Sequence, residues 1–219
     1  MCKERNETNI SQYQSFLKDA EHLKELRVFR HDFKNRIIGL KALLDNGKYD
    51  EAKEYLNSLE QLFDITEKGD ISYSNNTLID AILQNTAYKC KKESIRFDAE
   101  VILSENELSL SQIDICSLFG NLCDNAFEAQ SGKNLSDAFI SITTSRREKW
   151  IIITVENRYD GITLNNSEGK ITTSKNDKEN HGFGLNIIKN IVESINGAKV
   201  LIEQDAENKV FSISLVFPR

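Results

Sequence analysis

Proline and excess positive charge are what this sequence lacks most. Its single proline among 219 residues is Pro218, so no proline interrupts a helix before the last two residues. Lysine and arginine number 28 against 34 aspartates and glutamates, which gives a formal net charge of -6. Because duplex binding depends on a positive surface that meets phosphates, this balance argues against nucleic acid as a direct partner.

Long apolar runs and metal-binding clusters are also missing. No stretch is apolar over the roughly 20 residues that a membrane-spanning helix needs, and no secretory signal is recognisable. The four cysteines, Cys2, Cys90, Cys116 and Cys123, form no CxxC pair, and no histidine clusters with them, so zinc is not expected. Scattered free thiols fit a reducing cytosol.

What the sequence does have is a strong helical pattern at its N-terminal end. Apolar residues recur in three- and four-residue steps, interrupted once by Arg30, up to a turn signal at residues 45–47. The recurring positions are Leu23, Leu26, Phe33, Ile37, Leu40 and Leu44. A second amphipathic helix follows. Because a lone helical hairpin cannot cover its own apolar face, we expect two copies to form a dimeric four-helix bundle.

The rest of the chain predicts a second domain with mixed elements. Residues 67–70 have the composition of a linker, which places a helical hairpin at 1–68 and a separate domain at 72–219. Helices are expected at 77–92, 111–130 and 185–195, and strands at 95–103, 139–144, 149–157, 199–204 and 210–217. This order predicts an α+β sandwich with helices on one face of a mixed sheet. The polar stretch 159–182 is either a surface loop or a lid over a ligand.

Four polar side chains share one face of the second of these helices. Asn121, Asp124, Asn125 and Glu128 lie three and four residues apart. An ordinary solvated face is one interpretation. Carboxamides are poor helix formers, however, and oxygen ligands on a helix suit Mg²⁺, which combines a few protein oxygens with phosphate oxygens and water.

Glycines precede the third helix. Gly182 and Gly184 would let backbone N–H groups approach a phosphate at the helix N-terminus, although such a pair more often marks a turn. The P-loop signature is absent. Upstream, Asn157 ends a predicted strand, where a polar side chain can contact the edge of a base.

One histidine stands out in the first helix. His31 falls one position after Arg30, so we expect it to be accessible to solvent. Asp32 is adjacent and Asn35 lies one turn further on. A lone histidine on a solvated face is usually only a surface residue, and these neighbours make a functional role more plausible.

Together and in order, these segments resemble the H, N and G boxes of sensor histidine kinases. The matching stretches are residues 29–35, 120–129 and 181–185. The ATP-binding part resembles the GHKL superfamily, with a Bergerat-type sandwich. The sequence is most similar to peptide-pheromone receptor kinases of the accessory-gene-regulator type, with citrate-sensor kinases as near relatives. The resemblance extends over residues 23–217.

The resemblance implies a complete set of roles. His31 would be autophosphorylated from ATP and would pass the phosphoryl group to an aspartate of a response-regulator receiver domain. Asp32 would hold the imidazole tautomer and act as a base, and Asn35 would orient water when the protein acts as a phosphatase. Asn125 would bind Mg²⁺ with help from Asn121. The other implied ATP-binding positions are Asn157, Gly161, Lys175, Gly182, Phe183, Gly184 and Leu185.

Three positions depart from the family pattern. Asn157 stands where the family's adenine-binding box has Asp, and Tyr159 occupies the place of that box's first glycine. Glu128 stands where many kinases carry a basic residue. Neutralisation of phosphate would then come from Lys175 or Lys178, which can equally be solvated loop lysines.

Asn121 also helps to distinguish the alternatives. ATPase relatives have a water-activating Glu at this place, and a carboxamide cannot accept the proton, so a pure ATP-driven clamp is disfavoured. The remaining alternative is a non-catalytic phosphotransfer or dimerisation protein with a degenerate nucleotide site. The resemblance also implies quorum sensing, a place at the cytoplasmic face of the membrane, and a membrane sensor domain upstream of this sequence.

Overall fold

The computed structural model describes residues 31–62, 71–104, 106–133, 135–160 and 183–219. The chain divides into two compact units, Met1–Ile65 and Thr66–Arg219. None of the helices within the described ranges has both the length and the apolar character that crossing a bilayer requires.

The first unit contains a helical hairpin. Residues 31–45 are helical, and α2 spans Tyr49–Leu62. The predicted turn between them is confirmed: Gly47 has a φ of 70°, and its N–H donates to Leu44 O at 3.0 Å. The two helices pack closely, since a Cβ added at Gly39 would lie 3.6 Å from the hydroxyl of Tyr55.

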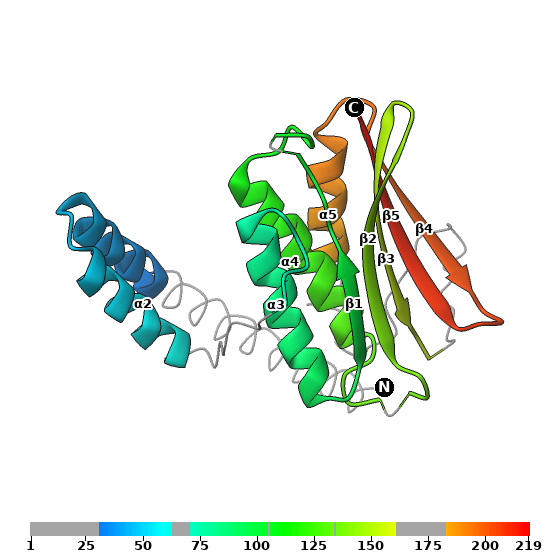
Figure 1. Cartoon of the computed structure of the whole chain (residues 1–219), viewed down its shortest axis with the longest axis horizontal. Helices are drawn as coiled ribbons and strands as arrows, with labels where there is room; N and C mark the ends of the chain where they lie inside the picture. Colours follow the sequence, from blue (N-terminus) through cyan, green and yellow to red (C-terminus); the bar gives the residue numbers. More distant parts are fainter. Residues whose placement is uncertain (1–30, 63–70, 105, 134, 161–182) are drawn as a thin grey trace, which may run out of the picture. The chain divides into compact units, whose positions relative to one another are not determined.

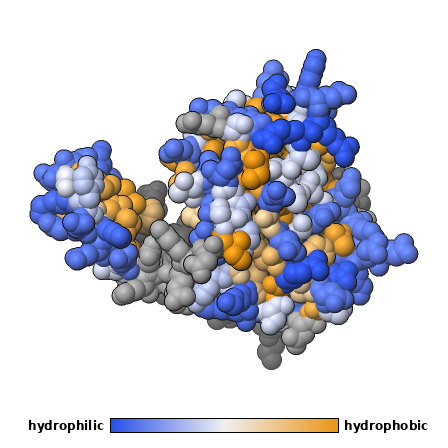
Figure 2. Space-filling view, viewed as in Figure 1, coloured by the Kyte–Doolittle hydropathy of each residue, from blue (hydrophilic) through white to orange (hydrophobic). Residues whose placement is uncertain are grey.

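The hairpin leaves apolar side chains in solvent. Phe33 and Ile37 are 49% and 47% exposed. Ile38, Leu44 and Leu56 are also exposed. Figure 2 shows apolar surface gathered along one side of this unit. The predicted positions Leu23, Leu26 and Arg30 lie outside the described residues.

In its described residues, the second unit is a five-stranded mixed sheet with three helices on one face (Figure 1). The strand order is β1-β2-β3-β5-β4; β1 is parallel to β2, and the other neighbours are antiparallel. The elements are α3 (Thr77–Lys92), β1 (Arg96–Glu100), α4 (Gln112–Glu128), β2 (Phe139–Arg147), β3 (Trp150–Arg158), α5 (Phe183–Glu193), β4 (Lys199–Asp205) and β5 (Val210–Pro218). The predicted α+β class is confirmed.

Alternation along the central strands builds the core. In β3, Ile151, Ile153 and Val155 point to the helices and are buried. In β5, Ile213, Leu215 and Phe217 do the same. The helices contribute the other half of this core, which includes the buried thiols Cys90 and Cys123. Burial raises the pKa of both thiols to about 12.

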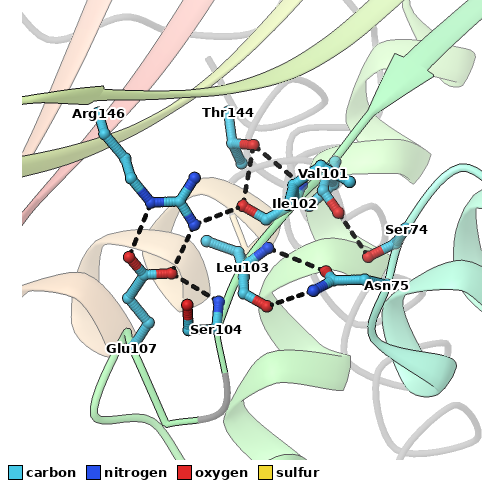
Figure 3. Close-up of polar contacts among 9 residues, drawn as sticks. All are labelled: Ser74, Asn75, Val101, Ile102, Leu103, Ser104, Glu107, Thr144 and Arg146. Carbon is cyan, nitrogen blue, oxygen red and sulfur yellow. Dashed lines mark hydrogen bonds and ion pairs between the residues drawn. The ribbon is translucent and has the colours of Figure 1, made fainter.

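The segment after β1 pairs with the chain before α3 rather than continuing the strand. Val101 N donates to Tyr73 O at 2.8 Å, and Ser74 Oγ donates to Val101 O at 2.7 Å. The carboxamide of Asn75 bonds both backbone groups of Leu103, at 2.8 and 2.9 Å (Figure 3). The predicted strand over 95–103 therefore ends at Glu100, because a different partner takes over the hydrogen bonds.

An ion pair between Arg146 of β2 and Glu107 joins β2 to the segment that follows β1, as Figure 3 shows. Arg146 donates from Nε and Nη2 to the two oxygens of Glu107, at 2.9 and 2.8 Å, and Nη2 also donates to Ile102 O at 3.0 Å. Ser104 N donates to Glu107 at 2.6 Å. The hydrogen bonds from Arg146 and Ser104 lower the pKa of Glu107 from 4.5 to about 2.

This ion pair gives a pH-dependent contribution to stability. A depressed carboxyl pKa stabilises the fold above the unfolded value, and the effect is lost as the pH falls from about 4.5 towards 2. We expect Glu107→Gln to lower the free energy of unfolding by roughly 1–2 kcal/mol at pH 7 and by much less at pH 3. Urea unfolding at both pH values measures this. Glu100→Gln, on an exposed side chain, is the matched control, and an equal loss at both pH values would contradict the assignment.

Candidate functional site

The central helix of the candidate site is α4. Ser111 caps its N-terminus by accepting from Asp114 N at 3.1 Å. One face packs into the core and carries Leu118, Phe119, Leu122, Cys123 and Ala126. Because these residues recur at helical spacing, the polar positions between them are forced onto the remaining faces.

Asn121 and Asn125 meet the start of α5. A Cβ added at Gly184 would lie 2.9 Å from Asn125 Oδ1, closer than real Cβ contacts come, and 3.1 Å from Asn121 Oδ1, which is tighter than most of them. Glycine at this position therefore lets the helix backbone approach both carboxamides. The first N–H groups of a helix have no intrahelical partner, so the positive end of α5 lies beside two amide oxygens.

The four polar side chains that were predicted to share one face of α4 have different surroundings. Asp124 accepts from Lys89 Nζ on α3 at 3.1 Å, and Lys89 also lies 5.9 Å from the centre of the Phe127 ring. Glu128 is exposed. Asn121 and Asn125 thus face α5, while Asp124 serves to join α4 to α3. The contact of Lys89 with α4 was missed because sequence spacing shows nothing of pairing between helices.

The carboxamide of Asn121 is held in one orientation. Its Nδ2 donates to Ser117 O at 2.7 Å, which leaves Oδ1 as its remaining polar atom. Asn125 differs: its Nδ2 is buried and has no hydrogen-bond partner. A buried amide without a partner is costly, so this atom marks a place where a bound ligand could supply one.

The amide oxygens of Asn121 and Asn125 are suitable ligands for a magnesium ion that is bound together with phosphate. Within the described ranges no group of three or more His, Cys, Asp or Glu side chains could hold a metal. Mg²⁺ commonly takes one or two protein oxygens and completes its shell with phosphate oxygens and water. The oxygens of Asn121 and Asn125 fit that requirement.

The end of β3 carries the second set of buried polar groups. Asn157 is 3% exposed and Tyr159 is 7% exposed. Asn157 Nδ2 donates to Arg158 O at 2.8 Å. Tyr159 Oη is buried without a partner, and together with Asn125 Nδ2 it completes the set of such side-chain atoms found in the described part of the chain. Both atoms lie on segments that the sequence marked for nucleotide binding.

The surroundings of this strand end are polar. Lys133 Nζ and an oxygen of Asp160 are 3.0 Å apart. A cavity of about 330 Å³ is lined by Tyr159, Arg158, Leu135, Ser136 and residues 207–209. In the sequence, Tyr159 stands out only as a departure from a glycine. Its burial follows from the inward alternation of β3, which continues past the end of the strand predicted over 149–157.

The candidate phosphoacceptor lies in the hairpin unit. His31 is 72% exposed, as predicted from its place in the helix. Its Nδ1 lies 3.4 Å from Asp32 Oδ1 and 3.3 Å from Asn35 Nδ2. Because one nitrogen cannot donate to a carboxylate and accept from an amide at the same time, these two neighbours favour different tautomers.

Several predicted positions are not described. Gly161, Lys175, Lys178 and Gly182 lie outside the described residues. Phe183 begins α5, but its side chain is not described. Leu185 is half-buried and packs against the core, so its contribution here is to position α5.

Comparison with known proteins shows a similarity to one domain family within this second unit. Residues 110–218 match the family model of the GHKL domain. This segment contains Asn121, Asn125, Asn157 and Gly184. The mixed sheet with helices on one face is therefore associated with a nucleotide-binding domain class.

The relatives are named as a sensor protein and a sensor histidine kinase. The chain is 25% identical over 198 residues to Sensor protein CitS of Bacillus subtilis (strain 168), an alignment that covers 88% of this chain and 36% of that protein. It is 22% identical over 207 residues to Sensor histidine kinase CitA of Klebsiella pneumoniae, covering 91% and 37%. The chain thus spans little more than a third of the length of these relatives. The matches support a sensor histidine kinase.

Among solved structures, the catalytic domain of histidine kinase ThkA is similar to this chain. That alignment covers 66% of this chain and 91% of the ThkA chain, with 24% identity and a TM-score of 0.49.

Proposed function

We propose that this chain binds Mg-ATP in its second unit, phosphorylates His31 and passes the phosphoryl group to an aspartate of a response regulator. The observation that carries the proposal is the buried Nδ2 of Asn125, which has no partner beside the closely approaching backbone of Gly184. The GHKL match over residues 110–218 supports it. Bound Mg²⁺ would neutralise charge on the phosphates.

The chemistry assigns one task to each hairpin residue. His31 Nε2 forms a bond to the γ-phosphorus while the bond from that phosphorus to the β–γ bridging oxygen breaks, and ADP leaves with the electron pair. The Nδ1 proton passes to Asp32, whose carboxylate lies 3.4 Å away. When the protein acts as a phosphatase, Asn35 would orient the water that attacks the phosphoaspartate of the response regulator and releases inorganic phosphate.

Labelling with γ-³²P-ATP tests the function. A phosphohistidine is acid-labile and alkali-stable, and its formation should require Mg²⁺. Absence of label together with absence of ATP binding would reject the proposal. That result would instead favour the alternative, a non-catalytic protein with a degenerate nucleotide site. The similarity to sensor kinases does not favour this alternative.

We further propose that two hairpins form a four-helix bundle. The support is the exposed apolar surface of the hairpin, which a single copy leaves in water. Phe33→Glu combined with Ile37→Glu should convert dimers to monomers in analytical ultracentrifugation and reduce autophosphorylation at least tenfold. Lys34→Glu, on an exposed neighbour, is the control. A double variant that stays dimeric would move the interface elsewhere.

The wider setting is part of the same proposal. The resemblance to peptide-pheromone receptor kinases favours a quorum-sensing role. The greater length of the matched sensor proteins favours a further, upstream membrane sensor domain, which would tether this chain to the cytoplasmic face of the membrane.

A further inference from the structure

Asn157 and Tyr159 lie on the same face of the sheet. Side chains two residues apart along a strand point the same way, and both are buried on the side that carries the helices. The ladder extends past the end of β3, because Tyr159 N donates to Lys209 O at 3.1 Å. The two side chains are therefore held in a fixed spacing.

Asn157 presents an acceptor. Its Nδ2 is engaged with Arg158 O at 2.8 Å, so Oδ1 is the atom left for a ligand. The Arg158 side chain is itself fixed, since Nε donates to Ser136 O at 3.3 Å and Nη1 donates to Asn208 O. Two other chain segments thus hold this strand end in place.

Tyr159 presents a donor. A buried hydroxyl with no partner costs stability that phenylalanine would not cost. A hydroxyl kept buried without a partner is explained by a ligand atom that accepts its proton.

We propose that Tyr159 Oη donates a hydrogen bond to the adenine ring of ATP, beside the contact that the family resemblance already assigns to Asn157. The 6-amino group would donate to Asn157 Oδ1, and Tyr159 Oη would donate to N1 or N7, the ring nitrogens that flank the amino group. Guanine carries an oxygen acceptor at position 6, which would face Oδ1 unfavourably. The inference rests on the proposed function and adds a specificity role for Tyr159.

Tyr159→Phe tests the proposal in the full chain. We expect Mg-ATP affinity, measured by calorimetry, to fall by about three- to tenfold, the value of one hydrogen bond. The ligand-free variant should melt at or above the wild-type temperature, because the unpartnered hydroxyl is gone. These opposite changes would not follow if the hydroxyl had a merely structural role. Tyr49→Phe, at a 69% exposed tyrosine, is the matched control.

Analogues of ATP identify the accepting atom. Wild-type protein should bind either 1-deaza-ATP or 7-deaza-ATP more weakly than ATP by the same factor, and Tyr159→Phe should bind that analogue and ATP equally. Equal losses in both proteins for both analogues would overturn the inference. Tighter ATP binding by Tyr159→Ala would also overturn it, because the ring would then occupy the place of the base. Wild-type protein that binds no ATP would instead reject the proposed function.

Discussion

His31→Gln is expected to abolish incorporation of phosphate from ATP while Mg-ATP affinity stays within about twofold of wild type. Glutamine keeps a polar side chain but has no nucleophilic nitrogen, so the acceptor is lost. The nucleotide site is proposed in the other compact unit, so its affinity should not depend on this side chain. Radiolabelling and calorimetry on the same preparations separate the two effects.

A second histidine supplies the control for this substitution. His22→Gln makes the same chemical change nine residues earlier in the sequence and should leave labelling unchanged. Label that persists in His31→Gln would reject the phosphoacceptor assignment. Loss of ATP affinity in that variant would show that the substitution had disturbed more than the acceptor.

Gly184→Ala is expected to weaken Mg-ATP binding by roughly 10- to 100-fold, the range seen when groups that orient metal ligands are lost. The added methyl group would lie 2.9 Å from Asn125 Oδ1 and 3.1 Å from Asn121 Oδ1. The closer contact is with the end of the Asn125 side chain, whose Nδ2 has no hydrogen-bond partner, so this carboxamide can rotate away from the methyl group. The free energy of unfolding should therefore change by less than about 1 kcal/mol, because alanine is otherwise well suited to a helix.

Gly120→Ala is the matched control on α4. A Cβ there would meet nothing within 4 Å, so we expect unchanged ATP affinity and a gain of roughly 0.5–1 kcal/mol in stability. Wild-type affinity in Gly184→Ala would contradict a nucleotide site beside the two carboxamides. A large loss of stability would point instead to a packing role for this glycine.

Sequence patterns predicted the elements of the second unit closely where local periodicity dominates. The helix expected at 77–92 is found as Thr77–Lys92, and the strand expected at 210–217 is found as Val210–Pro218. The strand expected at 95–103 ends earlier, at Glu100, because pairing with residues 74 and 75 replaces the sheet ladder. Such pairing joins segments far apart in the chain and leaves no local signal.

For polar side chains too, the sequence predicts the face of the helix but not the partner. Gln130 is the last residue of the helix predicted over 111–130, and its spacing indicates no partner. In the structure its buried carboxamide forms hydrogen bonds with both the N–H and the carbonyl group of Phe139, at 2.9 Å each. Asp124 shared a face with Asn125 in the sequence pattern, but its partner is Lys89 of another helix. Periodicity places a residue on a face of its own helix, while the packed neighbour decides what that face contacts.

By itself, the sequence determined the α+β class, the hairpin with its exposed His31, and the residue types that could bind magnesium and phosphate, because these depend on spacing and chemistry within single elements. Tertiary structure alone decided that Gly184 brings α5 against Asn121 and Asn125, and that Tyr159 is buried with a hydroxyl lacking a partner. Those two facts depend on how separate segments pack, since close approach and desolvation arise only when distant parts of a chain are brought together.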